Sequence, residues 1–172
     1  MSSHLTEQKI VEARQSTKDW IARAANLYAV ELPEIEVRFD LRGKTSGMFY
    51  YRDGQYAIRY NSAIFSRYFE ESLQQTVPHE VAHYVVHRIY GRRVKPHGVE
   101  WKQVMRDFGV PPDVTSKLNV SDLSTRQLRR FPYRCGCGEH DLSSIRHNRI
   151  AQGTRQYGCP KCQQILVAHK QL

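Results

Sequence analysis

The sequence has no long apolar run and no apolar leader. No stretch of its 172 residues approaches the roughly 18 consecutive apolar residues of a membrane-spanning helix. Its first residues, MSSHLTEQKIVEARQ, lack the apolar core of a secretory signal. It also has no internal repeat and no low-complexity tract. We therefore expect a cytoplasmic protein without a membrane partner.

Cysteine is scarce and confined to the C-terminal end. The four cysteines form two close pairs, Cys135/Cys137 and Cys159/Cys162. In a reducing cytoplasm, pairs with this spacing favour metal thiolates over disulfides. A redox function for Cys159-x-x-Cys162 would require βαβ surroundings, which this region lacks. The spacing therefore predicts a metal site in the last part of the chain.

The composition is that of a globular protein with an excess of basic residues. Apolar residues make up 40% and charged residues 25%, which is enough for a packed core. The net charge is +9; residues 131–172 carry six Lys and Arg against two Asp and Glu, or +4, leaving +5 for residues 1–130. This balance favours a polyanionic partner such as nucleic acid, although a solvated basic surface would have the same composition.

Hydrophobic periodicity predicts helices around a small sheet. Residues 6–28 have the spacing of an amphipathic helix, and residues 35–39 alternate as in a half-buried strand. Residues 48–51 and 55–60 flank Asp53-Gly54, a dipeptide typical of tight hairpin turns. This tyrosine-rich hairpin could border a cleft as an edge strand that pairs with an extended substrate, or could be a packed sheet.

The segment His79-Glu80-Val81-Ala82-His83 matches the pattern H-E-x-x-H. On a helix, residues four apart share a face, so both imidazoles can reach one Zn²⁺. Glu80 can then serve as general base toward water activated by the metal. Apolar neighbours predict that this helix is buried. Pro78 predicts either a helix that starts near Thr76 or a longer helix that kinks there.

A catalytic zinc site needs a third protein ligand. His87 lies about 12 Å along the helix axis from His79 and cannot share its ion. The metzincin extension is excluded because Val86 and Ile89 stand where it requires Gly and His. His97 is the better candidate, because Gly91 ends the helix and a six-residue loop allows the chain to return. Glu100, one turn later, either supports a ligand or is a surface carboxylate.

These residues resemble the SprT family of zinc metalloproteins. HEVAH at 79–83 followed by His97-Gly98-Val99-Glu100-Trp101 is similar to the family's HExxH and HGxEW motifs, and the tail from Tyr133 to Cys162 resembles its terminal zinc ribbon. The resemblance implies a minimal gluzincin-like protease core in which His79, His83 and His97 bind zinc and Glu80 is catalytic. Spartan proteases, relatives in this family, degrade proteins crosslinked to DNA and are activated by DNA.

The resemblance also guides the choice of ribbon ligands. Cys159 and Cys162 form a standard zinc half-site, whereas Cys135-Gly136-Cys137 is tighter than usual. Cys137 with His140 offers an alternative pair in which His140 replaces Cys135. We expect Cys135 and Cys137, because their Tyr-Arg-Cys lead-in matches the first knuckle of the family. Basic and aromatic residues around the ribbon would suit phosphate contact and base stacking.

The prediction is an α+β protein with two zinc sites, one catalytic and one structural. It comprises a gluzincin-like core at residues 1–115 (a helix, a small twisted sheet, the HExxH helix and a downstream helix), a basic linker at 116–130 and a zinc ribbon at 131–172. It would be a zinc metalloendopeptidase acting on proteins, with nucleic acid, including single-stranded DNA, as a further partner and DNA-associated or crosslinked proteins as substrates. The alternative is a non-catalytic zinc protein that binds DNA or RNA.

Overall fold

The first helix, α1 (Glu7–Tyr28), runs the length of the first unit. The Thr6 side chain caps it by accepting a hydrogen bond from the Lys9 N–H, as in many helix N-termini. Its buried residues recur at helical spacing and include Ala13, Thr17, Ile21 and Ala24. The Thr17 hydroxyl lies 2.9 Å from the Tyr60 hydroxyl, which ties the helix to the sheet. The helix predicted at residues 6–28 is therefore confirmed.

Three strands form a small mixed sheet with the order β1-β3-β2. Strand β1 (Glu36–Arg38) pairs in parallel with β3 (Gln55–Tyr60), and β2 (Gly47–Arg52) pairs antiparallel with β3. Asp53 and Gly54 both have positive φ, 52° and 81°, and form the predicted hairpin turn. Strand β2 therefore lies at one edge of the sheet.

The chain then forms a series of helical segments that ends in the H-E-x-x-H helix. Asn61 caps α2 (Ser62–Arg67), and α3 (Phe69–Glu71) leads into a π-helical turn, η1 (Ser72–Thr76). Helix α4 (Val77–Tyr90) follows directly, with Pro78 in its first turn. Because Pro78 has no N–H to donate, a change of helical pitch just before it causes little loss of hydrogen bonding. Helix α4 therefore starts next to Thr76, as the first predicted alternative states. The π-helical turn continues it toward the N-terminus, as in the longer helix of the second alternative.

Beyond α4 the chain turns back toward the same helix. Gly91, with φ of 73°, begins the short 3-10 helix η2 (Gly91–Arg93), and α5 (Val99–Asp107) follows. Helix α5 begins two residues after His97, because His97 has a positive φ of 56° and Gly98 is the N-cap. His97 therefore lies in the turn that precedes the helix.

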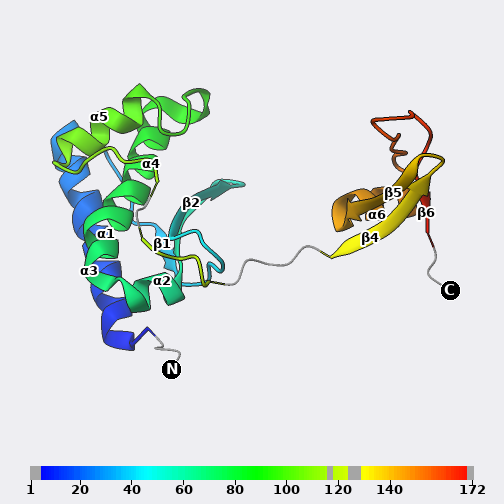
Figure 1. The fold of residues 1–172 in the computed structure, drawn as a ribbon. Coiled ribbons are helices and arrows are strands. Elements are labelled where there is room, and N and C mark those ends of the chain that lie inside the picture. Colours follow the sequence, from blue (N-terminus) through cyan, green and yellow to red (C-terminus); the bar gives the residue numbers. More distant parts are fainter. Residues whose placement is uncertain (1–4, 116–117, 124–128, 170–172) are drawn as a thin grey trace. The chain divides into compact units, whose positions relative to one another are not determined.

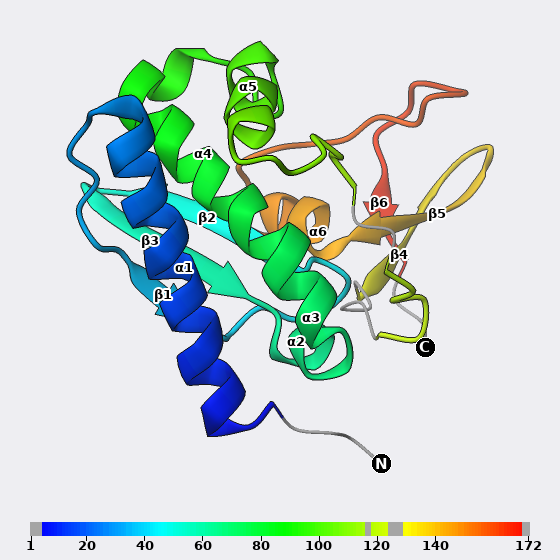
Figure 2. The same cartoon turned by 90° about the vertical axis from the view of Figure 1, so that its left-hand side faces the viewer.

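Helices α1 and α4 pack side by side over one face of the sheet, and α5 packs against α4 (Figures 1 and 2). The core lies between these layers and is rich in fully buried residues from all of them, including Ile58, Phe65, Val81, Val85 and Trp101. This packing makes α4 the central element of the first unit.

These observations come from a computed structural model that describes residues 5–115, 118–123 and 129–169. The chain divides into two compact units, Met1–Thr125 and Arg126–Leu172. Of the linker predicted at 116–130, residues 118–123 belong to the first unit, while 116–117 and 124–128 lie outside the described residues. Across the described parts of the chain, no helix combines the length and the apolar character needed to cross a membrane.

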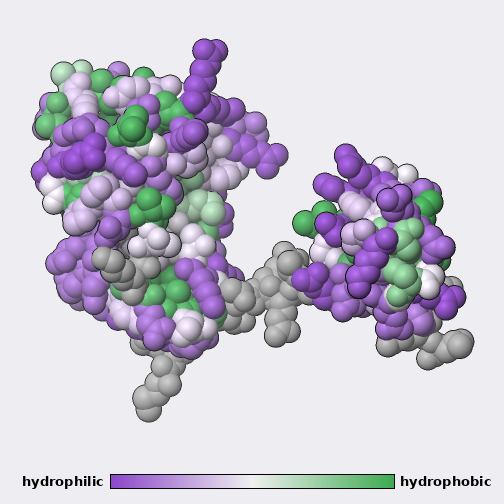
Figure 3. Space-filling model, turned by 45° about the horizontal axis from the view of Figure 1, so that its top comes forward, coloured by the Kyte–Doolittle hydropathy of each residue, from purple (hydrophilic) through white to green (hydrophobic). Residues whose placement is uncertain are grey.

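The second unit is a small sheet with one helix. Strands β4 (Arg130–Cys135) and β5 (Gly138–Ser143) form a hairpin, α6 (Ser144–Ala151) follows, and β6 (Val167–Ala168) pairs with β4. Among the described residues of this unit, the buried core comprises Tyr133, Leu142, Cys159 and Leu166. Hydrophilic residues cover most of the face of each unit seen in Figure 3. A core this small is typical of domains stabilised by a metal or by disulfides.

Candidate metal centres and active site

Three histidine side chains converge in the first unit. His79 and His83 lie one turn apart on α4, and His97 comes from the turn before α5. The Nε2 atoms of His83 and His79 are 3.3 Å apart, and the Nε2 atom of His97 lies 3.0 Å from each. The structure thus brings together the histidines that the sequence predicted as ligands.

The spacing and protonation of these imidazoles fit a metal ion. A tetrahedral zinc ion with bonds of about 2.0–2.1 Å to nitrogen holds its ligand atoms about 3.3 Å apart. Burial, followed by the proximity of His97, lowers the pKa of His79 to about 4. Burial, followed by His79 and His97, lowers the pKa of His83 to about 3, and burial also lowers the pKa of His97. All three rings are neutral at pH 7 and offer lone pairs to a cation.

Two further groups hold the rings in place. Trp101 is fully buried, and its ring centroid lies 4.7 Å from those of His79 and His97. Its indole N–H donates to the backbone carbonyl of His79 at 3.3 Å. The backbone of Asp113 hydrogen-bonds the His79 imidazole. Such contacts orient metal-binding histidines in proteins. The contribution of Asp113 has no counterpart in the sequence motifs, because it depends on how the chain returns after α5.

Glu80 is buried beside the histidines and is 6% exposed. Its Oε2 accepts a hydrogen bond of 2.7 Å from the backbone N–H of Phe49 on β2. Burial raises the pKa of this carboxyl to about 8, and the Phe49 N–H opposes that shift. A carboxyl poised near neutrality can both accept and donate a proton in this pH range.

The histidines and Glu80 line a cavity of about 900 Å³. One side is formed by the chain from Lys44 to Phe49, which includes the first half of β2. A second side is formed by residues 109–111, 113–115, 118 and 120, which follow α5. The tip of the β2–β3 hairpin does not belong to the lining. Of the hairpin that was predicted either to border a cleft or to be a packed sheet, only Met48 and Phe49 at the beginning of β2 line this cavity.

Two side chains weighed as ligands lie outside the histidine group. His87 packs among aromatic rings of the β2–β3 hairpin, with its ring centroid 4.5 Å from that of Tyr51. Glu100 is half-buried on α5. Within the described part of the chain, His79, His83 and His97 alone form the metal-binding group of the first unit.

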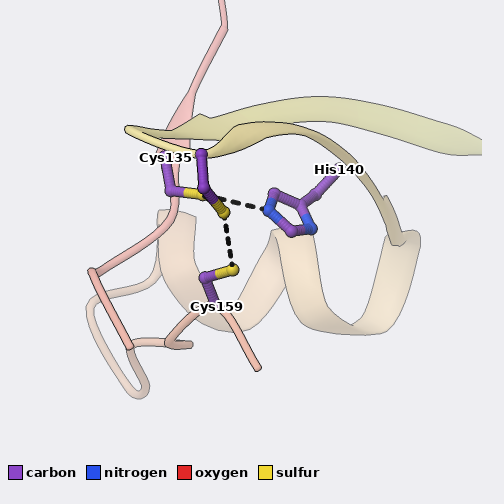
Figure 4. Close-up of side chains that lie close together, drawn as sticks. Cys135, His140 and Cys159 are labelled. Carbon is purple, nitrogen blue, oxygen red and sulfur yellow. Dashed lines mark hydrogen bonds between the residues drawn. The ribbon is translucent and has the colours of Figure 1, made fainter. Parts of the chain in front are cut away.

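A second potential metal site lies in the second unit. The side chains of Cys135, Cys137, His140 and Cys159 place their ligand atoms within 4.8 Å of one another. Cys135 Sγ lies 3.2 Å from His140 Nε2, and Cys137 Sγ lies 3.5 Å from Cys159 Sγ. Figure 4 shows Cys135, His140 and Cys159 pointing toward a common centre from the hairpin and from the loop after α6. This donor set suits zinc.

The donor set differs in one member from the four cysteines expected from the sequence. Cys135 pairs with Gly138 across the hairpin, and His140 is two residues further along β5, so Cys135 and His140 share a face as diagonal neighbours. Cys162 falls outside the set of atoms that all lie within 4.8 Å of one another, but its thiol contacts that of Cys137 and lies 3.8 Å from Oε1 of Gln164. Backbone N–H groups of Cys162 and Lys161 lower the pKa of Cys159 to about 6, which favours the thiolate that metals bind.

Comparison with known proteins supports the family resemblance seen in the sequence. Residues 14–121 match the model of the SprT-like family. A protein named Protein SprT from Vibrio parahaemolyticus is 36% identical over 156 residues, covering 90% of this chain and 91% of that protein. Proteins of the same name from Glaesserella parasuis and Pseudomonas fluorescens are 42% and 35% identical, over 76% and 87% of this chain and 81% and 90% of theirs. The chain belongs to the SprT-like family.

Proposed function

We propose that this chain is a zinc-dependent endopeptidase with a gluzincin-like active site. His79, His83 and His97 would hold the ion, and Glu80 would act as the general base. The observation that carries the proposal is the buried carboxyl of Glu80 beside three converging imidazoles, because a purely structural metal site has no use for a carboxyl there. When bound, zinc would polarise a substrate carbonyl and make water a nucleophile near neutral pH.

The residues of the chain have separate roles in this proposal. Glu80 takes a proton from the attacking water and can return it to the leaving amine. The N–H of Phe49 holds one oxygen of Glu80, which keeps the carboxyl in one orientation. Because β2 lies at the edge of the sheet, its start can guide an extended peptide past Glu80. Trp101 shields the imidazoles from solvent on one side.

The decisive experiment is the substitution Glu80→Gln in the zinc-loaded full chain. We expect cleavage of a denatured protein substrate to fall by about 10²–10⁴-fold, the usual contribution of general acid–base catalysis, with zinc content unchanged. The matched control is Glu71→Gln, at an exposed carboxyl on α3 outside the cavity. Cleavage that persists in Glu80→Gln would contradict the role of Glu80, and a wild-type chain that cleaves nothing would contradict the peptidase.

Nucleic acid is the second partner that we propose, and the charge distribution supports it. From Arg126 onward the chain has nine Lys and Arg against two Asp and Glu, a net charge of +7, whereas residues 1–125 carry 17 against 15. In the second unit, Arg129 lies over the Phe131 ring and Arg146 over the Tyr157 ring. Cations beside aromatic rings suit single-stranded nucleic acid. Substrates would then be proteins associated with, or crosslinked to, nucleic acid.

A peptidase and a non-catalytic nucleic-acid-binding protein make different predictions about single-stranded DNA. If the chain is a peptidase that uses DNA to reach its substrates, DNA should increase cleavage of DNA-bound proteins by wild type and leave Glu80→Gln inactive. If the chain only binds nucleic acid, wild type and Glu80→Gln should bind DNA equally, and neither should cleave.

A further inference from the structure

The chain after α5 lies along the cavity as a strap, which we define as residues 109–115 and 118–123. Its far end is fastened to the helices before α4 (Figure 1). Two hydrogen-bonded contacts of 2.8 Å join the Arg67 guanidinium to the Asp122 carboxylate. The Tyr68 hydroxyl donates to the backbone carbonyl of Asn119 at 2.9 Å. Asp113, near the beginning of the strap, is hydrogen-bonded to His79. The strap is therefore attached both at the histidines and beyond them.

The strap presents apolar side chains to the cavity. Val110, Val114, Leu118 and Val120 line it, and Met48 does so from the start of β2. Val114 is 48% exposed and Met48 is 40% exposed. Of these residues, only Val110 also packs against the hydrophobic core of the first unit. The exposed apolar surface of Val114 and Met48 thus adjoins the candidate catalytic centre.

Charged side chains are few along this part of the cavity. Lys44, Glu80 and Asp113 are the charged lining residues in the described part of the chain. Glu80 is engaged with Phe49, and the backbone of Asp113 is engaged with His79. Apart from Asp113 and Thr115, the strap residues in the lining are apolar, whereas polar residues such as Thr45 and Gln74 line other parts of the cavity. The apolar part selects apolar ligand groups, because it cannot replace the hydration of a charged one.

We infer that the strap and Met48 form a subsite for a large aliphatic or aromatic side chain of an extended polypeptide substrate. The inference rests on the proposed peptidase function and deepens it by naming a substrate class. A polypeptide is the occupant that fits, because the apolar surface is continuous with Glu80, the histidines and the edge strand β2. Folded proteins bury such side chains, so the subsite favours unfolded or locally exposed segments.

The test measures binding separately from cleavage. Two fluorescent peptides of equal length and charge, differing only in one central Leu or Ser, are titrated into the zinc-loaded full-length Glu80→Gln protein. We expect the Leu peptide to bind at least about tenfold more tightly, as an apolar pocket discriminates between side chains. Val114→Asp and Val120→Asp should each bring the two affinities toward equality. Val120→Thr keeps the shape of valine and should reduce the difference between the two affinities in part. It serves as the control for misfolding of the Asp variants.

Val11→Asp is the matched control, since Val11 is a 57% exposed valine on α1 outside the cavity lining. It should leave the ratio of the two affinities unchanged. Equal binding of the Leu and Ser peptides, or a ratio that Val120→Thr and both Asp variants leave unaltered, would overturn the inference. Cleavage by wild type without side-chain preference would also overturn the inference and leave the peptidase standing. Preferential binding of a Leu peptide that wild type does not cut would support the subsite and contradict the peptidase.

Discussion

Gly47 lies directly against Glu80 and limits how that side chain can be placed. A Cβ atom at this position would lie 2.7 Å from Cγ of Glu80, 2.8 Å from its Oε1 and 2.8 Å from Cγ2 of Thr76. These separations are shorter than van der Waals contact, and Glu80 and Thr76 are both buried. Gly47 therefore lets the start of β2 approach α4 closely enough for the Phe49 N–H to reach Glu80.

We predict that Gly47→Ala displaces Glu80 and destabilises the first unit. The free energy of unfolding should fall by about 1–3 kcal/mol, as in other overpacked cores, and peptidase activity should fall while zinc content stays the same. The check is a double-mutant cycle measured by chemical denaturation. In a Glu80→Ala background, the cost of Gly47→Ala should shrink, because two of the three close contacts are removed and only that with Thr76 remains. An equal cost in both backgrounds would contradict the proposed contact.

The strap depends on a partly exposed ion pair. The side chains of Arg67 and Asp122 are 41% and 59% exposed, so this pair contributes little to global stability, about 0–1 kcal/mol. We predict that Arg67→Ala changes the unfolding midpoint only slightly but increases amide hydrogen exchange in residues 118–123. Exchanging the two charges, Arg67→Asp with Asp122→Arg, should restore protection. Unchanged exchange in Arg67→Ala would show that Tyr68 and apolar contacts hold the strap alone.

In the second unit, the hairpin sets the geometry of the metal site. The register of β4 and β5 places His140 with Cys135, whereas Cys162 lies at the margin of the group, in contact with Cys137. We predict that His140→Ala loses one equivalent of bound zinc per chain and that Cys162→Ser keeps it, as measured by atomic absorption on the purified full chain. Loss of zinc in Cys162→Ser together with full retention in His140→Ala would favour the set of four cysteines.

For the whole molecule, the division of charge separates the two proposed activities. The first unit contains the histidines and Glu80 but has a small net charge, and the second unit carries most of the excess positive charge. We predict that Arg146→Ala weakens binding to single-stranded DNA and reduces by about one the slope of log affinity against log salt. Arg14→Ala, at an exposed arginine on α1, is the control and should leave that slope unchanged. Equal effects of the two substitutions would argue against the second unit as the nucleic-acid surface.

Local patterns in the sequence were sufficient to predict the main elements of the first unit and the histidines that converge in it. The helical spacing of α1 and the Asp53-Gly54 turn depend on neighbouring residues, and the structure confirms them. The pairing of His79 with His83 follows from the pitch of a helix. His97 could be chosen as the third ligand because His87 lies too far from His79 along the helix, and because Ile89 stands where the metzincin pattern requires a histidine.

Only the tertiary structure decided the features that depend on distant segments of the chain. The contact of Gly47 and Phe49 with Glu80, the support of His79 by Asp113, and the return of residues 118–123 to the first unit all join elements whose relative positions no local pattern specifies. The approach of His140 to Cys135 depends likewise on strand register, which the spacing of these residues in the sequence does not specify. The sequence thus determined the chemistry available to this protein, and packing determined which groups meet.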